Sequence, residues 1–312
     1  LGDFALSKVL CASGSTATIT NTTGGGSWSI VSGNATINSA TGLLTSTGTG
    51  NVQIRYSHPG VPGTSCPNTK DTTITIAVNP TVTPSASPTP ICFGSNTTVT
   101  ANGFGGATPY SYSWSPSGTG ASFSANPTST TTYNVTLTDN NGCTATGSTT
   151  VNVTGTAALT ANAGNAKTIC NGSSVILGGS PTASGGAGAY TYAWDNGAGA
   201  SANPTVSPTA TTTYNVTVTS SGCTASSSVV VTVNGTPTVT PSAAASTICY
   251  GSTTTITANG FGGSTPYSYN WSPTGTGASF TANPTATTTY MVTLTDNNGC
   301  TATGSTTVNV TG

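Results

Sequence analysis

The chain has 312 residues, of which 3% are charged, and its formal net charge is −1. Nucleic acids and anionic membranes attract clustered Lys and Arg side chains. Because the sequence has few of these, we expect neither as a partner. No run approaches the about 20 apolar residues that a membrane helix needs. The sequence opens directly at Leu1 without a signal peptide, as we expect of a mature or trimmed product.

Eight cysteines recur in four pairs and indicate a tandem array of four modules. The first cysteines of the pairs are 81, 78 and 79 residues apart, and each second cysteine follows its partner by 51 to 55 residues. We therefore predict modules at 1–79, 80–155, 156–235 and 236–312. Regular pairs without metal-ligand spacing also indicate an oxidising, extracellular compartment.

The first module is the most divergent of the four. It contains Ser27-Trp28-Ser29-Ile30, followed by NATINSATGLLTSTGTGNVQIRY, in place of the YxYxW segment of the others. Its two cysteines, Cys11 and Cys66, still follow the common spacing. We expect a related domain with a different middle. Its leading segment, LGDFALSKVL, is predicted to be the first strand of this module, and strand exchange with a neighbouring chain is the alternative.

The second and fourth modules are near-copies, and the third is a diverged relative. Residues 91–155 agree with residues 248–312 at 56 of 65 positions. In the fourth module the segments 253–258 (TTTITA), 290–295 (YMVTLT) and 306–310 (TTVNV) alternate polar and apolar residues, which is typical of strands. Turn signals rich in Gly, Pro, Asn and Asp separate them. The prediction is an all-β array of antiparallel β-sandwiches that forms an elongated rod.

A family resemblance rests on four motifs that recur along residues 80–312. These are IC-x-G-S, Y-x-Y-x-W-S-P, N-P-T-x-T-T-T-Y-x-V-T and D-N-N-G-C-T. They resemble the Ig-like and PKD-like repeats of Bacteroidota surface proteins, and the WS…TGLLT…G pattern of the first module resembles a bacterial Ig-like domain. The resemblance implies an extracellular all-β stalk or adhesive array, and it specifies no ligand.

Catalytic and metal-binding residues are scarce in this sequence. The five carboxylates never pair closely, and His58 lies in YSHPGVPG without a Ser or Cys and an acid arranged around it. We therefore predict no enzyme, no cofactor and no metal site. Asp139 and Asp296 in TDNNGC are expected to form tight turns, with calcium binding as the weaker alternative. Asp71-Thr72-Thr73 resembles a short Bacteroidota O-glycosylation motif.

The aromatic residues fall into a buried and an exposed set. Period two places Tyr110, Tyr112 and Trp114 on one face of a strand, and this pattern recurs at 190–194 and 267–271. A sugar-stacking platform would use the same pattern, but a core role is favoured for the tryptophans. The predicted core residues are Trp28, Trp114, Trp194 and Trp271. Phe104 and Phe261, in Gly-rich NGFGG loops, are the candidates for ligand contact, or they fold back onto the sandwich.

The cysteines allow two pairing schemes. In the first, each module closes its own disulfide, as 11–66, 92–143, 170–223 and 249–300. In an Ig-like sandwich, however, the first cysteine would lie in the A–B turn and the second in the F–G turn, at opposite ends of the module. We therefore favour pairing between neighbouring modules: Cys11–Cys143, Cys92–Cys223 and Cys170–Cys300. Cys66 and Cys249 are then left for an intermolecular disulfide.

These observations predict an extracellular, non-enzymatic structural protein. It would be the subunit of a surface filament, or the stalk of an adhesin, that self-associates head to tail. The alternatives are a glycan- or protein-binding adhesive module and the spacer region of a larger secreted protein.

Overall fold

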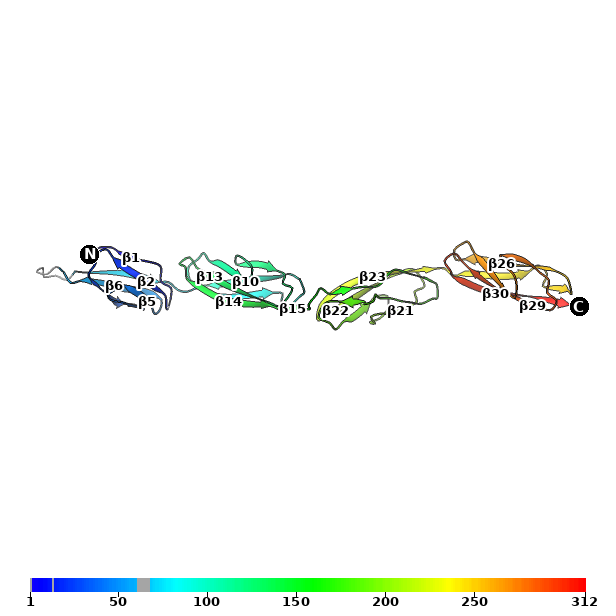
Figure 1. Ribbon diagram of the computed structural model, residues 1–312, viewed down its shortest axis with the longest axis horizontal. Helices are drawn as coiled ribbons and strands as arrows, with labels where there is room; N and C mark the ends of the chain where they lie inside the picture. Colours follow the sequence, from blue (N-terminus) through cyan, green and yellow to red (C-terminus); the bar gives the residue numbers. More distant parts are fainter. Residues whose placement is uncertain (1, 13, 61–67) are drawn as a thin grey trace. The chain divides into compact units, whose positions relative to one another are not determined.

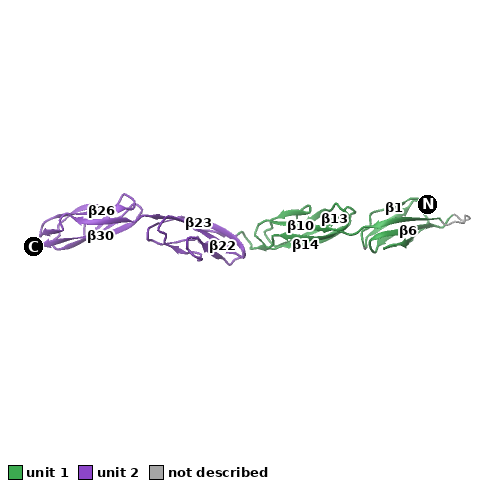
Figure 2. Cartoon of the chain, turned by 180° about the vertical axis from the view of Figure 1, so that it is seen from behind, with its two compact units in different colours: residues 1–158 green, residues 159–312 purple. Residues whose placement is uncertain are grey.

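The computed structural model describes residues 2–12, 14–60 and 68–312, and this part of the chain contains strands and no helix. The predicted all-β class is therefore confirmed. By its contacts the chain divides into two compact units, 1–158 and 159–312, which are coloured separately in Figure 2. Each unit holds two hydrophobic clusters, so that one cluster lies within each predicted module. Figure 1 traces the strands in chain order.

The first module is a sandwich of a four-stranded and a three-stranded sheet. The sheet orders are β1-β2-β5-β4 and β3-β6-β7, which correspond to strands A-B-E-D and C-F-G of an immunoglobulin constant-type domain. The middle differs from that of the other modules, as predicted, because β4 adds strand D. The strands are β1 (Phe4–Leu6), β2 (Thr16–Asn21), β3 (Ser27–Ser32), β4 (Ala35–Ile37), β5 (Leu43–Ser46), β6 (Gly50–His58) and β7 (Asn68–Ile76).

The leading segment of the chain belongs to this module. Strand β1 pairs antiparallel with β2, so the structure uses the segment as strand A of its own sheet. The centre of the Phe4 ring lies 5.5 Å from that of Trp28, and the ammonium group of Lys70 lies 5.4 Å from the centre of the Phe4 ring. These contacts hold β1 against the core of the first module.

The second module packs the sheet β8-β10-β12 against the sheet β11-β13-β14. The short strand β9 pairs in parallel with β15, which continues β14. This is the A′–G pairing of an immunoglobulin-like sandwich. The strands are β8 (Thr81–Ser87), β9 (Ile91–Cys92), β10 (Thr97–Phe104), β11 (Ser111–Ser115), β12 (Ser122–Ala125), β13 (Thr131–Thr138), β14 (Thr144–Val151) and β15 (Val153–Thr154).

The third module keeps the four-stranded sheet β17-β23-β22-β20 but breaks its other layer into two short pairs, β16-β19 and β18-β21. The sequence differs from that of the neighbours here, with LGGSPT between β18 and β19, the two halves of strand B. The strands are β16 (Thr160–Ala161), β17 (Lys167–Cys170), β18 (Val175–Ile176), β19 (Ala183–Ser184), β20 (Thr191–Trp194), β21 (Thr205–Val206), β22 (Thr212–Ser220) and β23 (Cys223–Asn234).

The fourth module repeats the second, with the sheets β24-β26-β28 and β25-β30-β29-β27. The alternating segments of the sequence analysis lie in β26, β29 and β30. The strands are β24 (Pro237–Ala243), β25 (Thr247–Cys249), β26 (Thr254–Gly262), β27 (Ser268–Ser272), β28 (Ser279–Ala282), β29 (Thr288–Thr295) and β30 (Thr301–Thr311).

The cores form where the alternation of the strands turns apolar side chains inward. In the fourth module Ile256, Val292, Leu294 and Val308 are fully buried. Trp271 is 5% exposed, and its indole N–H donates to the carbonyl of Gly277 at 3.0 Å. The buried ring therefore keeps a partner for its polar edge. Trp28, Trp114 and Trp194 are likewise 6–7% exposed, so all four tryptophans lie in cores.

Strands A and G of the fourth module touch across the sandwich at a glycine. A Cβ atom on Gly304 would lie 2.7 Å from Pro241 Cδ and 3.0 Å from the Val239 carbonyl oxygen. Gly304→Ala should therefore destabilise this module by about 1–3 kcal/mol, as overpacking does. Hydrogen exchange should accelerate in β24 and β30 and stay unchanged in β13 and β22. Gly235→Ala is the control, since a Cβ there meets nothing within 4 Å. Equal effects of both substitutions would contradict this packing.

Candidate linkage sites at the module ends

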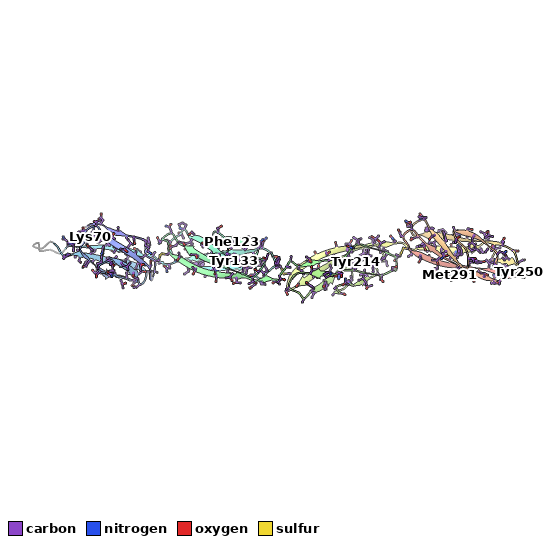
Figure 3. The ribbon with its side chains drawn as sticks, in the orientation of Figure 1. Lys70, Phe123, Tyr133, Tyr214, Tyr250 and Met291 are labelled. Atoms are coloured by element: carbon purple, nitrogen blue, oxygen red, sulfur yellow. A yellow bond between two sulfur atoms is a disulfide. The ribbon has the colours of Figure 1, made fainter. Side chains whose placement is uncertain are left out.

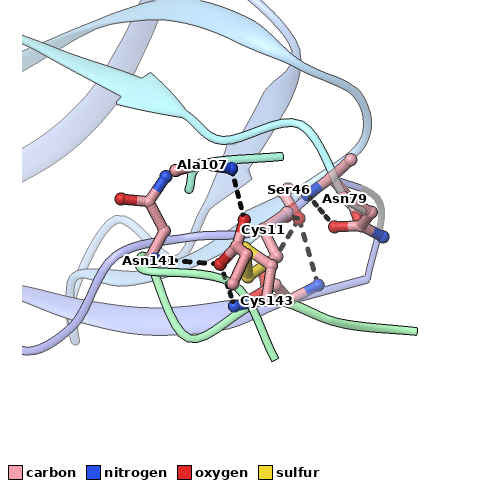
Figure 4. Close-up of a disulfide and its surroundings, with 9 residues drawn as sticks. Cys11, Ser46, Asn79, Ala107, Asn141 and Cys143 are labelled. Carbon is pink, nitrogen blue, oxygen red and sulfur yellow. Dashed lines mark hydrogen bonds between the residues drawn. A yellow bond between two sulfur atoms is a disulfide. The ribbon is translucent and has the colours of Figure 1, made fainter. Parts of the chain in front are cut away.

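A disulfide joins the first module to the second. Cys11 lies just before strand B of the first module, and Cys143 lies in the turn between β13 and β14, strands F and G of the second. Their Cα atoms are 5.6 Å apart (Figure 4). The bond therefore connects the A–B side of one sandwich to the F–G turn of the next, as in the second cysteine pairing scheme of the sequence analysis.

A buried aspartate holds the F–G turn that carries Cys143. Asp139 is 5% exposed, and its Oδ1 accepts the backbone N–H groups of Asn141 at 2.9 Å and Cys143 at 2.8 Å. Its Oδ2 accepts the N–H of Ala107, in the B–C loop, at 2.9 Å. The carboxylate thus closes the turn and ties it to the neighbouring loop. This is the turn role that the sequence favoured over calcium binding.

The segment that carries Cys11 is fixed by side chains from elsewhere in the first module. The Ser46 hydroxyl, on a residue that is 2% exposed, donates to the Cys11 carbonyl at 2.8 Å. The Asn79 amide brackets Ala12, accepting its N–H at 3.0 Å and donating to its carbonyl at 3.3 Å. Cys11 also forms a parallel bridge with Ala77, just before the connection to the second module.

A second disulfide joins the third and fourth modules in the same way. Cys170 ends β17, and Cys300 lies in the F–G turn before β30, with Cα atoms 5.7 Å apart. Asp296 repeats the role of Asp139. It is 5% exposed and accepts the N–H groups of Ser264, Asn298 and Cys300 at 2.8–2.9 Å.

The third module closes its F–G turn without an aspartate. Ser221 and Gly222 form the two-residue turn between β22 and β23, both with positive φ, as such a hairpin requires. The Ser220 hydroxyl is buried and accepts the Ala187 N–H at 3.1 Å, in the place of the aspartate. A shorter turn therefore needs only one side-chain acceptor.

The strand register rules out disulfides within the second, third and fourth modules. Cys92 lies beside Thr154 and Cys249 beside Thr311, whereas Cys143 and Cys300 precede the other ends of the same G strands. About eleven residues of strand separate the two positions, or roughly 36 Å. Disulfide-bonded Cα atoms lie within about 7 Å of each other.

The remaining cysteines occupy matching positions. Cys92 and Cys223 are both disulfide-bonded, and neither is free. Cys249 ends β25 at the site equivalent to Cys11 and Cys170, and it is exposed with a free thiol. The adjacent Tyr250 is 68% exposed (Figure 3). Cys66 lies outside the described residues.

The other candidate residues separate clearly. Phe104 and Phe261 lie at the end of strand B of their modules, paired with strand A rather than in loops as predicted, and each is 59% exposed. They therefore do not fold back onto the sandwich. His58 ends β6, where its Nδ1 accepts the Gly60 N–H at 3.2 Å. Asp71 forms a bidentate ion pair with Arg55 at 2.7 and 2.8 Å.

The ionisable groups serve local structure. The hydrogen bonds from Arg55 hold the pKa of Asp71 below its ordinary value, and that ion pair raises the pKa of Arg55. Hydrogen bonds from the Asn215 side chain and backbone lower the pKa of Asp195. Within residues 2–12, 14–60 and 68–312, no three His, Cys, Asp or Glu side chains gather to hold a metal ion. The same residues contain no helix that is long and apolar enough to span a membrane.

Comparisons with known proteins identify no family. No family model and no curated protein matches the sequence. Among solved structures, an eight-Ig-domain fragment of DSCAM matches 99% of this chain at 14% identity and a TM-score of 0.36, and this chain spans about half of that fragment (48%). Sidekick-1 immunoglobulin domains 1–4 match 100% of this chain and 98% of theirs, at 12% identity and a TM-score of 0.27. The titin fragment I67–I69 matches 73% of this chain and 99% of its own, at 11% identity and a TM-score of 0.36. The strand order itself defines a chain of tandem immunoglobulin-like sandwiches.

Acid should loosen the Asp296 turn. Burial raises the pKa of Asp296, but the hydrogen bonds from backbone N–H groups outweigh it, so the pKa lies below its ordinary value. The stabilisation by this carboxylate is therefore complete above the unfolded-state pKa and is lost as pH falls through the lower folded-state pKa. An NMR titration of the Asp296 carboxyl carbon checks the direction, and a pKa above the model-peptide value would contradict it. Asp296→Asn should weaken protection of the Asn298 and Cys300 amides at neutral pH. Asp3→Asn, at a wholly exposed side chain, should not.

Proposed function

We propose that this chain is an extracellular structural protein without catalytic activity, and that it is the subunit of a surface filament or the stalk of an adhesin. The observation that carries the proposal is the use of disulfides between modules. Two of these bonds run from the A–B side of one sandwich to the F–G turn of the next. Such bonds strengthen the connection between modules rather than the modules themselves, which is useful where load passes along an array.

Extending the same rule completes the array. Cys92 would pair with Cys223 across the middle of the chain. Cys249 and Cys66 would then be the two open ends, one on the A–B side of the last module and one in the segment between β6 and β7, strands F and G of the first. A disulfide between Cys249 of one molecule and Cys66 of the next is a heterologous, head-to-tail contact, which propagates without closing.

The chemistry of the surface supports an extracellular place and a structural role. Disulfides persist in oxidising compartments, so the cell surface or the medium is the expected location. His58 and the carboxylates of Asp71, Asp139 and Asp296 bond to neighbouring backbone amides or to Arg55, without the nucleophile, base and orienting acid that a triad needs. With 3% charged residues, self-association would meet little charge repulsion. The four Lys and Arg residues also offer little positive charge to attract nucleic acid.

Covalent assembly should depend on the open ends. Purified oxidised protein should form filaments by electron microscopy and disulfide-linked multimers on non-reducing gels, and reductant should remove the multimers. Cys249→Ser or Cys66→Ser should leave nothing longer than a dimer joined through the remaining thiol, while Thr247→Ser, on the same strand as Cys249, should change nothing. Non-reducing peptide mapping should give Cys66–Cys249 and Cys92–Cys223 linked peptides. Multimers longer than a dimer that persist in both serine variants would refute the head-to-tail bond.

A second candidate function, adhesion to a glycan or protein, rests on the two exposed phenylalanines. Phe104 and Phe261 occupy the same position at the end of strand B in the near-identical second and fourth modules, so one contact would recur every second module. Exposed aromatic side chains suit stacking on sugars or insertion into a protein pocket. A spacer in a larger secreted protein would need no such residues.

Adhesive binding should be lost with these side chains. On a glycan array, or with an extracted surface protein as ligand, Phe104→Ala combined with Phe261→Ala should lower affinity roughly tenfold or more. Met291→Ala is the control, because Met291 is 53% exposed on a sheet face of the fourth module. Binding that survives the double substitution would exclude these side chains as the contact.

A further inference from the structure

The two described disulfides shorten the covalent path through the chain. The bond between Cys11 and Cys143 bypasses 132 residues of sequence, and that between Cys170 and Cys300 bypasses 130. A pull between the two ends of the chain therefore runs through 1–11, crosses to 143–170, crosses again and leaves through 300–312. The two bypassed loops, residues 12–142 and 171–299, lie outside this path. This path stays the shortest whatever bonds Cys92 and Cys223 make, because any route through either of these residues adds a long stretch of chain.

The bypassed loops contain the parts of the fold that a pull would otherwise unravel. All four core tryptophans lie within them, at Trp28, Trp114, Trp194 and Trp271. Strands B, C, E and F of every module also lie within them, so both layers of each sandwich depend on residues outside the load path. Tension between the ends therefore does not draw these strands out of their sheets.

The segments that carry the load are already extended. Between Cys143 and Cys170 lie β14, β15, β16 and β17, and after Cys300 comes β30. A strand rises 3.2–3.4 Å per residue, while a fully stretched chain reaches at most about 3.6 Å per residue. These strands have little length left to give. They are also held laterally, since β15 and β17 pair in parallel with β9 and β23.

We infer that the inter-module disulfides make this protein an inextensible tether, in which tension follows G strands and A′ strands and is diverted around the sandwich cores. The inference rests on the proposed function in its adhesin-stalk form, in which tension enters and leaves through the chain ends, and it specifies how that load would pass through the array. Immunoglobulin-like modules without such bonds lengthen under force by unfolding one at a time. Here the limit on length is covalent, and it applies even if a core unfolds.

Single-molecule stretching of the full chain, held at residues 1 and 312, tests this limit. The oxidised protein should reach a contour length of only about 170 Å, without stepwise unfolding. After reduction the same molecule should unfold module by module and gain about 900 Å, because both bypassed loops are released. Stepwise lengthening of the oxidised protein by whole modules would overturn the inference.

Variants locate the load path. Cys11→Ser combined with Cys143→Ser opens one bypass without leaving an odd thiol. It should add about 370 Å to the oxidised contour length, because the proposed Cys92–Cys223 bond would still shorten the remaining route. Cys170→Ser with Cys300→Ser tests the other bypass independently, should the first variant fold poorly. Cys249→Ser is the matched control, since Cys249 takes part in neither of the two disulfides. The contour length of this variant should not change. A gain with Cys249→Ser, or none with either double variant, would refute the path. The readout uses single chains, so a failure to form filaments would count against the proposed function alone.

Discussion

The parallel pairing of the A′ segment with strand G is the constraint on which the linkage depends. In the second and fourth modules it sets the first cysteine beside the far end of strand G, at Cys92 and Cys249. The second cysteine, Cys143 or Cys300, sits in the turn where strand G begins. Because strand G is a single extended run, the two sulfurs of one module face opposite ends of the sandwich. Each cysteine can therefore form a disulfide only with a cysteine of a neighbouring module or molecule.

A nearly uncharged composition is compatible with this fold because hydroxyl groups replace ion pairs on the sheet surfaces. The strands F and G of the second and fourth modules place Thr132 opposite Thr150 and Thr289 opposite Thr307, with hydroxyl oxygens 2.9 Å apart. Such cross-strand threonine pairs stabilise a sheet modestly and do not depend on pH or salt. Within residues 2–12, 14–60 and 68–312, the ion pairs are those of Arg55 with Asp71 and Lys70 with Asp3, both in the first module.

The sequence alone was sufficient for features that repeat or alternate. The cysteine period predicted an array of modules, and the period-two pattern predicted strands such as β29 and the burial of Trp271. It could not show contacts between residues distant in sequence. Nothing near Cys11 marks Ser46 or Asn79 as its supports, and TDNNGC reads as a turn without revealing that Asp139 also reaches Ala107. The short A′ strands escaped notice because two to four residues carry no periodicity.

The crossing of each disulfide over a long stretch of chain also affects survival outside the cell. A protease that cuts a single peptide bond between Cys11 and Cys143, or between Cys170 and Cys300, leaves the two products joined through sulfur. Loops such as NGFGG and the F–G turns can therefore be nicked without parting the chain. A cut that would sever an ordinary string of domains therefore leaves its products covalently joined.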